Sequence, residues 1–226
     1  MEYNKIIEEL KKKTDEVILF HSGTGKDSIM LLDLCSKNFK KVHCVFMYIV
    51  KGLQYENNYI NWAKNKYSNV TFQQTPHYAV YSFLRNGYLG INQNPNIKKT
   101  TIANIDLHFR KKLGLNYSIY GFKKVDGITR RFMLNDCING MNEKTNKVYP
   151  LMNLKNSDVL NYIRDNKLIP PFNYGTKKPS SGCDISTPEF LQYLSVQYPN
   201  DLKLIFAQFP MAEAILFKYR EFTLKK

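Results

Sequence analysis

Apolar and polar positions alternate along this chain in a way that predicts short strands separated by helices. Ile6, Ile7 and Leu10 recur at helical spacing within residues 3–13 and predict an amphipathic helix. Residues 16–21 (EVILFH) form a short apolar run typical of a buried strand. Further strands are expected at residues 41–49, 70–73, 117–123 and 147–152, and further helices at residues 27–36, 55–66, 79–88, 100–113 and 156–166.

Strands that alternate with helices are typical of a parallel sheet covered by helices on both faces. We therefore predict an α/β fold, a Rossmann-like, doubly wound, mostly parallel sheet of five strands with a helical C-terminal part. Pro170 interrupts the chain, and residues 187–220 are mostly helical in pattern. The economical division is a sheet domain over residues 1–150 and a helical region over residues 151–226 that packs on it.

The junction after the first strand has the residues of a phosphate-binding loop. Glycines let backbone N–H groups approach phosphate oxygens, and the N-terminus of the following helix adds donors and a favourable dipole. Lys26 brings a positive charge, and Asp27 is placed to cap the helix or to hold a metal-bound phosphate. The residues predicted to contact a nucleotide here are Ser22, Gly23, Thr24, Gly25, Lys26, Asp27 and Ser28.

Two common phosphate-binding motifs do not fit this loop. The Walker A motif requires a glycine five residues before Gly25, where this chain has Phe20, and a Ser or Thr after Lys26, where it has Asp27. The Rossmann fingerprint fails because no third glycine follows at its spacing.

The composition of the chain indicates in which cellular compartment it works and which kinds of partner it could bind. The four cysteines lie far apart and form no C-x-x-C pair, which predicts neither a metal site, an iron–sulfur cluster nor a disulfide framework. No segment has the length of apolar sequence that a membrane span needs, and we expect a cytoplasmic protein. The net charge of +14 favours a nucleic-acid partner, but only six of the 33 basic residues are arginine and the charge is spread along the chain.

The loop resembles the S-G-G-x-D-S pyrophosphate loop (PP-loop) of the adenine-nucleotide α-hydrolase-like superfamily, with Thr24 making it one residue longer. Residues 121–127 (GFKKVDG), with Arg130 and Arg131, resemble a G-x-R-x-x-E-S…R segment, and residues 150–163 are similar to a P-L-x-x-W…D-V-W-x-Y-I block. These segments occur together in the phosphoadenosine phosphosulfate (PAPS) reductase-like family, and the resemblance covers about residues 15–190.

The resemblance implies a set of site residues and substrates. ATP, adenylylsulfate or PAPS would be the substrate, with Mg²⁺ bound to the nucleotide. The paired cysteines that hold a cluster in adenylylsulfate reductases are missing here, so no iron–sulfur cluster is expected. Lys26, Asp27, Arg130 and Arg131 would act in catalysis, because preplaced donors stabilise the charge that develops in transfer. Beyond the loop, nucleotide-binding residues would be Gly121, Lys123, Lys124, Asp126, Ser181, Gly182 and Cys183.

The chain departs from the family pattern in its cysteines, and this favours adenylyl transfer or pyrophosphate release over reduction. Reductases of this family use a cysteine in a C-terminal E-C-G-[IL]-H motif, and this chain has no cysteine after Cys183. Action at the α-phosphate, as adenylyl transfer or pyrophosphate release, therefore fits better than reduction. Three alternatives stay open: ATP-dependent sulfur modification of DNA or RNA, sulfonucleotide reduction through Cys183, and a nucleotide-sensing module without catalysis. A partner subunit and a homodimer also stay open.

Overall fold

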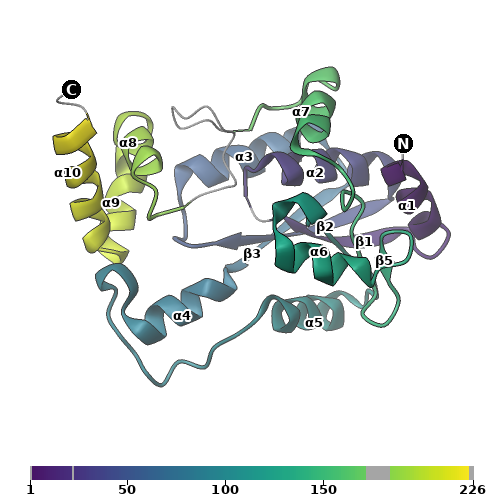
Figure 1. The fold of residues 1–226 in the computed structure, drawn as a ribbon, viewed down its shortest axis with the longest axis horizontal. Helices are drawn as coiled ribbons and strands as arrows, with labels where there is room; N and C mark the ends of the chain where they lie inside the picture. The colour runs from purple at the N-terminus through teal and green to yellow at the C-terminus, as the bar shows by residue number, and fades with distance from the viewer. Residues whose placement is uncertain (1, 22, 172–183, 224–226) are drawn as a thin grey trace.

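A six-stranded sheet forms the middle layer of the structure, with helices on both faces (Figure 1). The computed structural model describes residues 2–21, 23–171 and 184–223. The strands are β1 Glu16–His21, β2 Lys41–Tyr48, β3 Val70–Pro76, β4 Ser118–Tyr120, β5 Met141–Asn142 and β6 Lys147–Val148. The helices are α1 Glu2–Lys11, α2 Lys26–Asn38, α3 Gln54–Lys66, α4 Tyr78–Asn86, α5 Ile102–Leu113, α6 Ile128–Asn135, α7 Asn156–Asp165, α8 Pro188–Gln197, α9 Pro199–Gln208 and α10 Met211–Thr223, with short 3₁₀ turns η1 Tyr88–Gly90 and η2 Lys124–Asp126.

The strand order is β3-β2-β1-β4-β6-β5. All neighbouring strands are parallel except β5, which runs antiparallel to β6. The predicted doubly wound, mostly parallel fold is therefore confirmed, but the predicted count of five strands was one too few. The missed strand, β5, pairs only Met141 with Val148 and Asn142 with Lys147, and two residues are too few to show a strand periodicity.

Both faces of the central strands are buried, which explains their continuous apolar sequence. In β1, Val17 and Leu19 belong to a core that also contains residues of α1, α2, α3 and α7. Their neighbours Ile18 and Phe20 point to the opposite face and pack in a second core with residues of α5 and α6. The alternation follows from the strand period of two.

The order of the strands reverses between β1 and β4. From β1 the chain builds outward through β2 and β3, then returns to pair β4 with the other edge of β1, matching Phe20 with Tyr120. In open α/β sheets the carboxyl ends of strands at such a reversal form a crevice where ligands bind. The loop after β1 and the segment after β4 therefore lie side by side.

The C-terminal helices form a third core at one end of the sheet. α8, α9 and α10 pack together beside η1, away from α1 (Figure 1). Their core includes Phe190, Leu194, Ile205 and Phe209. The preceding α7 instead belongs with the sheet, because Val159 packs in the core of α1 and α2. The division of the chain near residue 150 stays a prediction.

Asp33 joins three elements on one face of the sheet. Its buried carboxylate, on α2, accepts hydrogen bonds from the hydroxyls of Tyr67 (2.9 Å) and Tyr162 (2.7 Å) and from Nζ of Lys37 (2.6 Å). Burial, and next the Asp33 carboxylate, raises the pKa of both tyrosines, so their hydroxyls stay protonated as donors. Asp33 thus holds the end of α3 and α7 against α2.

No helix in the described part of the chain has the length and apolar character needed to cross a membrane.

Asp33→Asn tests this junction. The amide has one acceptor oxygen in place of two, so we expect the free energy of unfolding to fall by roughly 2–4 kcal/mol. Urea denaturation measures the change. Lys37→Met is the control, because the Lys37 side chain is 51% exposed and should contribute little. Equal small losses in both variants would contradict the assigned role.

Candidate functional site

The loop after β1 places the first turn of α2 at the edge of the crevice. Gly23 has a φ of +107°, a conformation that favours glycine, although a Cβ there would meet no atom within 4 Å. Gly25 precedes α2 and has no side chain with which to cap it. The amide groups of the first turn are therefore available to an acceptor from outside the helix, such as a phosphate.

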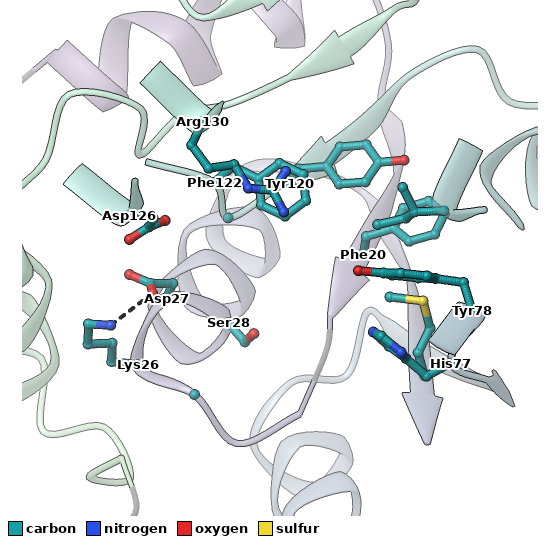
Figure 2. A pocket seen from close by; sticks show the side chains of 14 residues that line it. Phe20, Lys26, Asp27, Ser28, His77, Tyr78, Tyr120, Phe122, Asp126 and Arg130 are labelled. Atoms are coloured by element: carbon teal, nitrogen blue, oxygen red, sulfur yellow. Dashed lines mark hydrogen bonds and ion pairs between the residues drawn. The ribbon is translucent and has the colours of Figure 1, made fainter. Parts of the chain in front are cut away.

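A pocket of about 460 Å³ opens between this loop and the segment after β4 (Figure 2). It has a polar end and an aromatic end. The polar end is built from the start of α2 and from the segment that leads into α6. Its wall is formed by Phe20, Gly25, Lys26, Asp27, Ser28, Met47, His77, Tyr78, Ile102, Tyr120, Gly121, Phe122, Asp126 and Arg130.

Asp27 is held between two lysines at the polar end. Nζ of Lys26 lies 3.1 Å from one carboxylate oxygen of Asp27, and Nζ of Lys123 lies 2.5 Å from the other. The predicted capping role of Asp27 is not seen: Gly25 is the N-cap of α2, and Asp27 lies in the first turn with its carboxylate paired to the two lysines. Asp27 instead ties the start of α2 to the segment after β4.

Lys123 is the buried centre of this charge cluster. Its side chain is 0% exposed, and its Nζ also lies 3.2 Å from the carboxylate of Asp126, which in turn accepts the backbone N–H of Lys123. A buried ammonium requires such partners, since an unpaired charge in the interior is costly. Asp27 and Asp126 turn their carboxylates toward one another (Figure 2). Lys123 therefore lies beneath the pocket and does not line it.

Arg130 brings a cation to the upper wall. It lies on α6, and its guanidinium carbon is 3.4 Å from the centre of the Phe122 ring (Figure 2). Stacking on an aromatic face orients the planar guanidinium while its N–H groups stay able to donate. The neighbouring Arg131 is exposed and does not line the pocket.

The aromatic end is formed where three strands finish. The rings of Phe20 and Tyr120 stack on one another, with their centroids 4.8 Å apart and an interplanar angle of 7°. Met47 from β2 and Tyr78 from α4 complete this side. Burial raises the pKa of Tyr120, and the negative charge of Asp106 raises it further. The Tyr120 hydroxyl therefore stays protonated. This end offers apolar contact area of the kind that planar rings need.

His77 adds a polar group to the aromatic end. Its Nδ1 accepts the N–H of Ala79 at 3.2 Å and so caps α4. Burial lowers the pKa of His77, which keeps the ring neutral. A neutral imidazole that accepts at Nδ1 carries its proton on Nε2, where it can donate to a ligand.

The structure brings part of the predicted site together. Gly25, Lys26, Asp27, Ser28, Gly121, Asp126 and Arg130 share the pocket wall. Thr24 and Lys123 are buried behind it, and Gly23, Lys124 and Arg131 do not line it. Ser22, Ser181, Gly182 and Cys183 lie outside the described residues. The binding and catalytic roles of all these residues stay predictions.

Sequence reasoning missed the aromatic end of the pocket. Phe20, Met47 and Tyr120 were assigned only to strands, and Tyr78, Ile102 and Phe122 were not singled out. The available signal was position, because residues at the carboxyl ends of adjacent parallel strands meet at one edge of the sheet.

Two solved structures resemble this chain in fold. One is the U34-tRNA thiolase NcsA from Methanococcus maripaludis with its [4Fe-4S] cluster, at 13% identity and a TM-score of 0.42, covering 97% of this chain and 78% of that one. The other is NH₃-dependent NAD synthetase from Campylobacter jejuni in complex with nitrate, at 15% identity and a TM-score of 0.49, covering 96% and 92%. Neither likeness carries an argument about the reaction.

The expectation that this chain has no iron–sulfur cluster was wrong as an exclusion. A protein that resembles it, NcsA, holds a [4Fe-4S] cluster. The physical reason is that a cluster-binding cysteine can lie far along the chain from the others, so the lack of a C-x-x-C pair does not by itself exclude a cluster. Within residues 2–21, 23–171 and 184–223 there is no group of three His, Cys, Asp or Glu side chains that could hold a metal ion, and Cys183 lies outside these ranges.

A family comparison covers most of the chain. No curated protein matches the sequence. The model of the phosphoadenosine phosphosulfate reductase domain matches residues 17–188, which include the loop, the segment after β4 and α7. The chain therefore belongs to the phosphoadenosine phosphosulfate reductase domain family.

Proposed function

We propose that this protein is a cytoplasmic PP-loop enzyme that binds ATP or an adenylated sulfate and acts at the α-phosphate, by adenylyl transfer or pyrophosphate release. The observation that carries the proposal is the polarity of the pocket. One end presents Lys26 and the first turn of α2, and the other presents the rings of Phe20, Tyr78 and Tyr120 (Figure 2). A nucleotide has the same division between anionic phosphates and a planar base.

The proposed orientation follows from this polarity. The adenine ring packs at the aromatic end, where Nε2–H of His77 donates to a ring nitrogen. The phosphates lie over Gly25 and Ser28, where the helix dipole and the amide groups favour an anion. Lys26 neutralises part of the phosphate charge, and Arg130 reaches the pocket from the opposite wall.

The proposed reaction is in-line displacement at the α-phosphorus. With ATP, an oxygen of the acceptor attacks the α-phosphorus, the bond from phosphorus to the bridging oxygen breaks, and the electron pair leaves with pyrophosphate. With an adenylated sulfate the same attack breaks the bond from phosphorus to the bridging oxygen, and sulfate is the leaving group. Lys26 and Arg130 stabilise the charge that develops on the leaving oxygens, since both are fixed before the reaction begins. Asp27 keeps Lys26 in place through its ion pair.

The described cysteines support this reaction over reduction. Burial raises the pKa of Cys35 and Cys44, which keeps both as unreactive thiols. Burial also raises the pKa of Cys137, followed by the charge of Asp136. Reduction through Cys183 concerns a residue outside the described ranges.

Lys26→Met tests the phosphate end of the pocket. Loss of a charged donor should weaken binding of ATP about 10- to 100-fold, because such contacts contribute roughly 1.5–3 kcal/mol. Adenosine binding should change less than about 2-fold, since the nucleoside lacks phosphates. Isothermal titration calorimetry measures both. Lys64→Met, an exposed lysine near the end of α3, controls for the lost charge. Equal losses for ATP and adenosine would refute the orientation.

Lys123→Met tests the buried charge cluster. Removing the cation leaves Asp126 without its ion pair and leaves Asp27 paired with Lys26 alone, so the free energy of unfolding should fall by roughly 3–5 kcal/mol. The double variant Lys123→Met/Asp126→Asn should lose less than Lys123→Met alone, because one of the two carboxylates is gone. Strictly additive losses in denaturant titrations would argue against the cluster.

His77→Asn tests the neutral histidine. An unfolded histidine takes up a proton below about pH 6.5, whereas the buried ring in the folded state resists it. The folding stability of the wild type should therefore be fully present above that pH and decline as the pH falls. Asparagine keeps the cap on α4 and does not titrate. The variant should thus lose less stability between pH 7.5 and pH 5 in thermal or denaturant unfolding. An identical decline in both proteins would contradict the prediction.

A further inference from the structure

The extra residue of the loop, Thr24, does not face the nucleotide pocket. Its side chain is buried, and its Oγ1 lies 2.6 Å from the hydroxyl of Tyr55 in a hydrogen bond. Both residues line a separate cavity of about 110 Å³ behind the loop, together with Ile29 from α2. The loop is therefore supported from behind by a side chain of α3.

Tyr55 is itself fixed by the C-terminal helices. The carboxylate of Asp201, on α9, accepts the backbone N–H of Tyr55 and that of Gln54, each at 2.8 Å. The Tyr55 ring makes edge contacts with Phe190 of α8 at 5.9 Å and with Tyr198 at 5.8 Å. Tyr55 thus contacts two C-terminal helices and the phosphate loop together.

The contact with Asp201 is a helix cap supplied from another element. Leu53 precedes α3 and provides no side-chain cap, so the first amide groups of α3 depend on Asp201. Asp201 is 2% exposed and depends equally on those amide groups, since a buried carboxylate needs donors. Asp201 thus caps α3 from a neighbouring helix, and its position on α9 is tied to the start of α3.

We infer that Tyr55 is a positioning residue that transmits the docking of the C-terminal helices to the phosphate loop through Thr24. The inference rests on the proposed function of that loop. Docking of α9 places the start of α3, the Tyr55 hydroxyl fixes Thr24, and Thr24 sets the backbone between Gly23 and Gly25. Because coupling between sites is reciprocal, an anion bound at the loop stabilises the docked helices in return.

Tyr55→Phe tests the inference with inorganic pyrophosphate as the probe. The variant keeps the ring and loses only the hydroxyl. We expect the affinity for pyrophosphate to fall about 3- to 10-fold, as expected for one lost hydrogen bond, with adenosine affinity unchanged. Tyr198→Phe is the matched control, because Tyr198 contacts the same ring while its hydroxyl accepts a long, exposed hydrogen bond from Asn58 (3.5 Å) and, among the described residues, it is Tyr55 that bonds Thr24. It should bind pyrophosphate as the wild type does.

Thr24 variants supply the second half of the test. Thr24→Val should weaken pyrophosphate binding as Tyr55→Phe does. Thr24→Ser should bind pyrophosphate as the wild type does, because serine keeps the hydroxyl. The double variant Thr24→Val/Tyr55→Phe should be no weaker than either single variant, since both remove one hydrogen bond. Additive losses would overturn the coupling.

The outcomes separate this inference from the proposed function. If the wild type does not bind pyrophosphate, the proposed function fails. If the wild type binds it and Tyr55→Phe binds equally well, or loses adenosine affinity to the same degree, only the positioning role is refuted. Amide hydrogen exchange on the wild type gives a check that needs no variant. Pyrophosphate should slow exchange of the Gln54 and Tyr55 amides, and unchanged exchange would overturn the inference.

Discussion

The parallel pairing of β1 with β4 is the constraint on which the site depends. It matches Phe20 with Tyr120, so the loop after β1 and the segment after β4 leave the sheet at the same edge. The ion pair between Asp27 and Lys123 then fixes these two segments to one another. The backbone around Gly121 is close as well, because a Cβ there would lie 3.3 Å from Leu31 and 3.4 Å from Asp27. Glycine at this position therefore allows the segment after β4 to pack closely against the first turns of α2.

Charge is balanced differently over the whole protein and within the pocket. The net charge of +14 describes a surface rich in lysine, whereas the polar end of the site pairs Lys26 and Lys123 with Asp27 and Asp126. The carboxylates keep the two lysines in fixed positions, and Arg130 adds a cation held by the ring of Phe122. Preplaced charges of this kind need little reorganisation when an anionic ligand arrives, which is how electrostatic stabilisation contributes to catalysis.

The fold and half of the site could be predicted from local sequence. The strand, glycine loop and helix around Gly25 and Lys26 are adjacent in the chain, so periodicity and motif were sufficient. The aromatic end could not be read in this way, because Phe20, Met47 and Tyr120 look like ordinary strand residues until the sheet order brings their ends together. Lys123 was expected to contact a nucleotide, and only the three-dimensional structure shows that two carboxylates hold it below the pocket. Helix α6 was not predicted, since it is short and exposes Ile128 and Phe132.

A crystal structure of the protein with ATP and Mg²⁺ would test the central claim most directly. The account predicts the adenine ring at the end of the pocket formed by Phe20, Tyr78 and His77, with the phosphates over the first turn of α2 beside Lys26. Phosphates directed away from α2, or a nucleotide bound elsewhere on the protein, would contradict it.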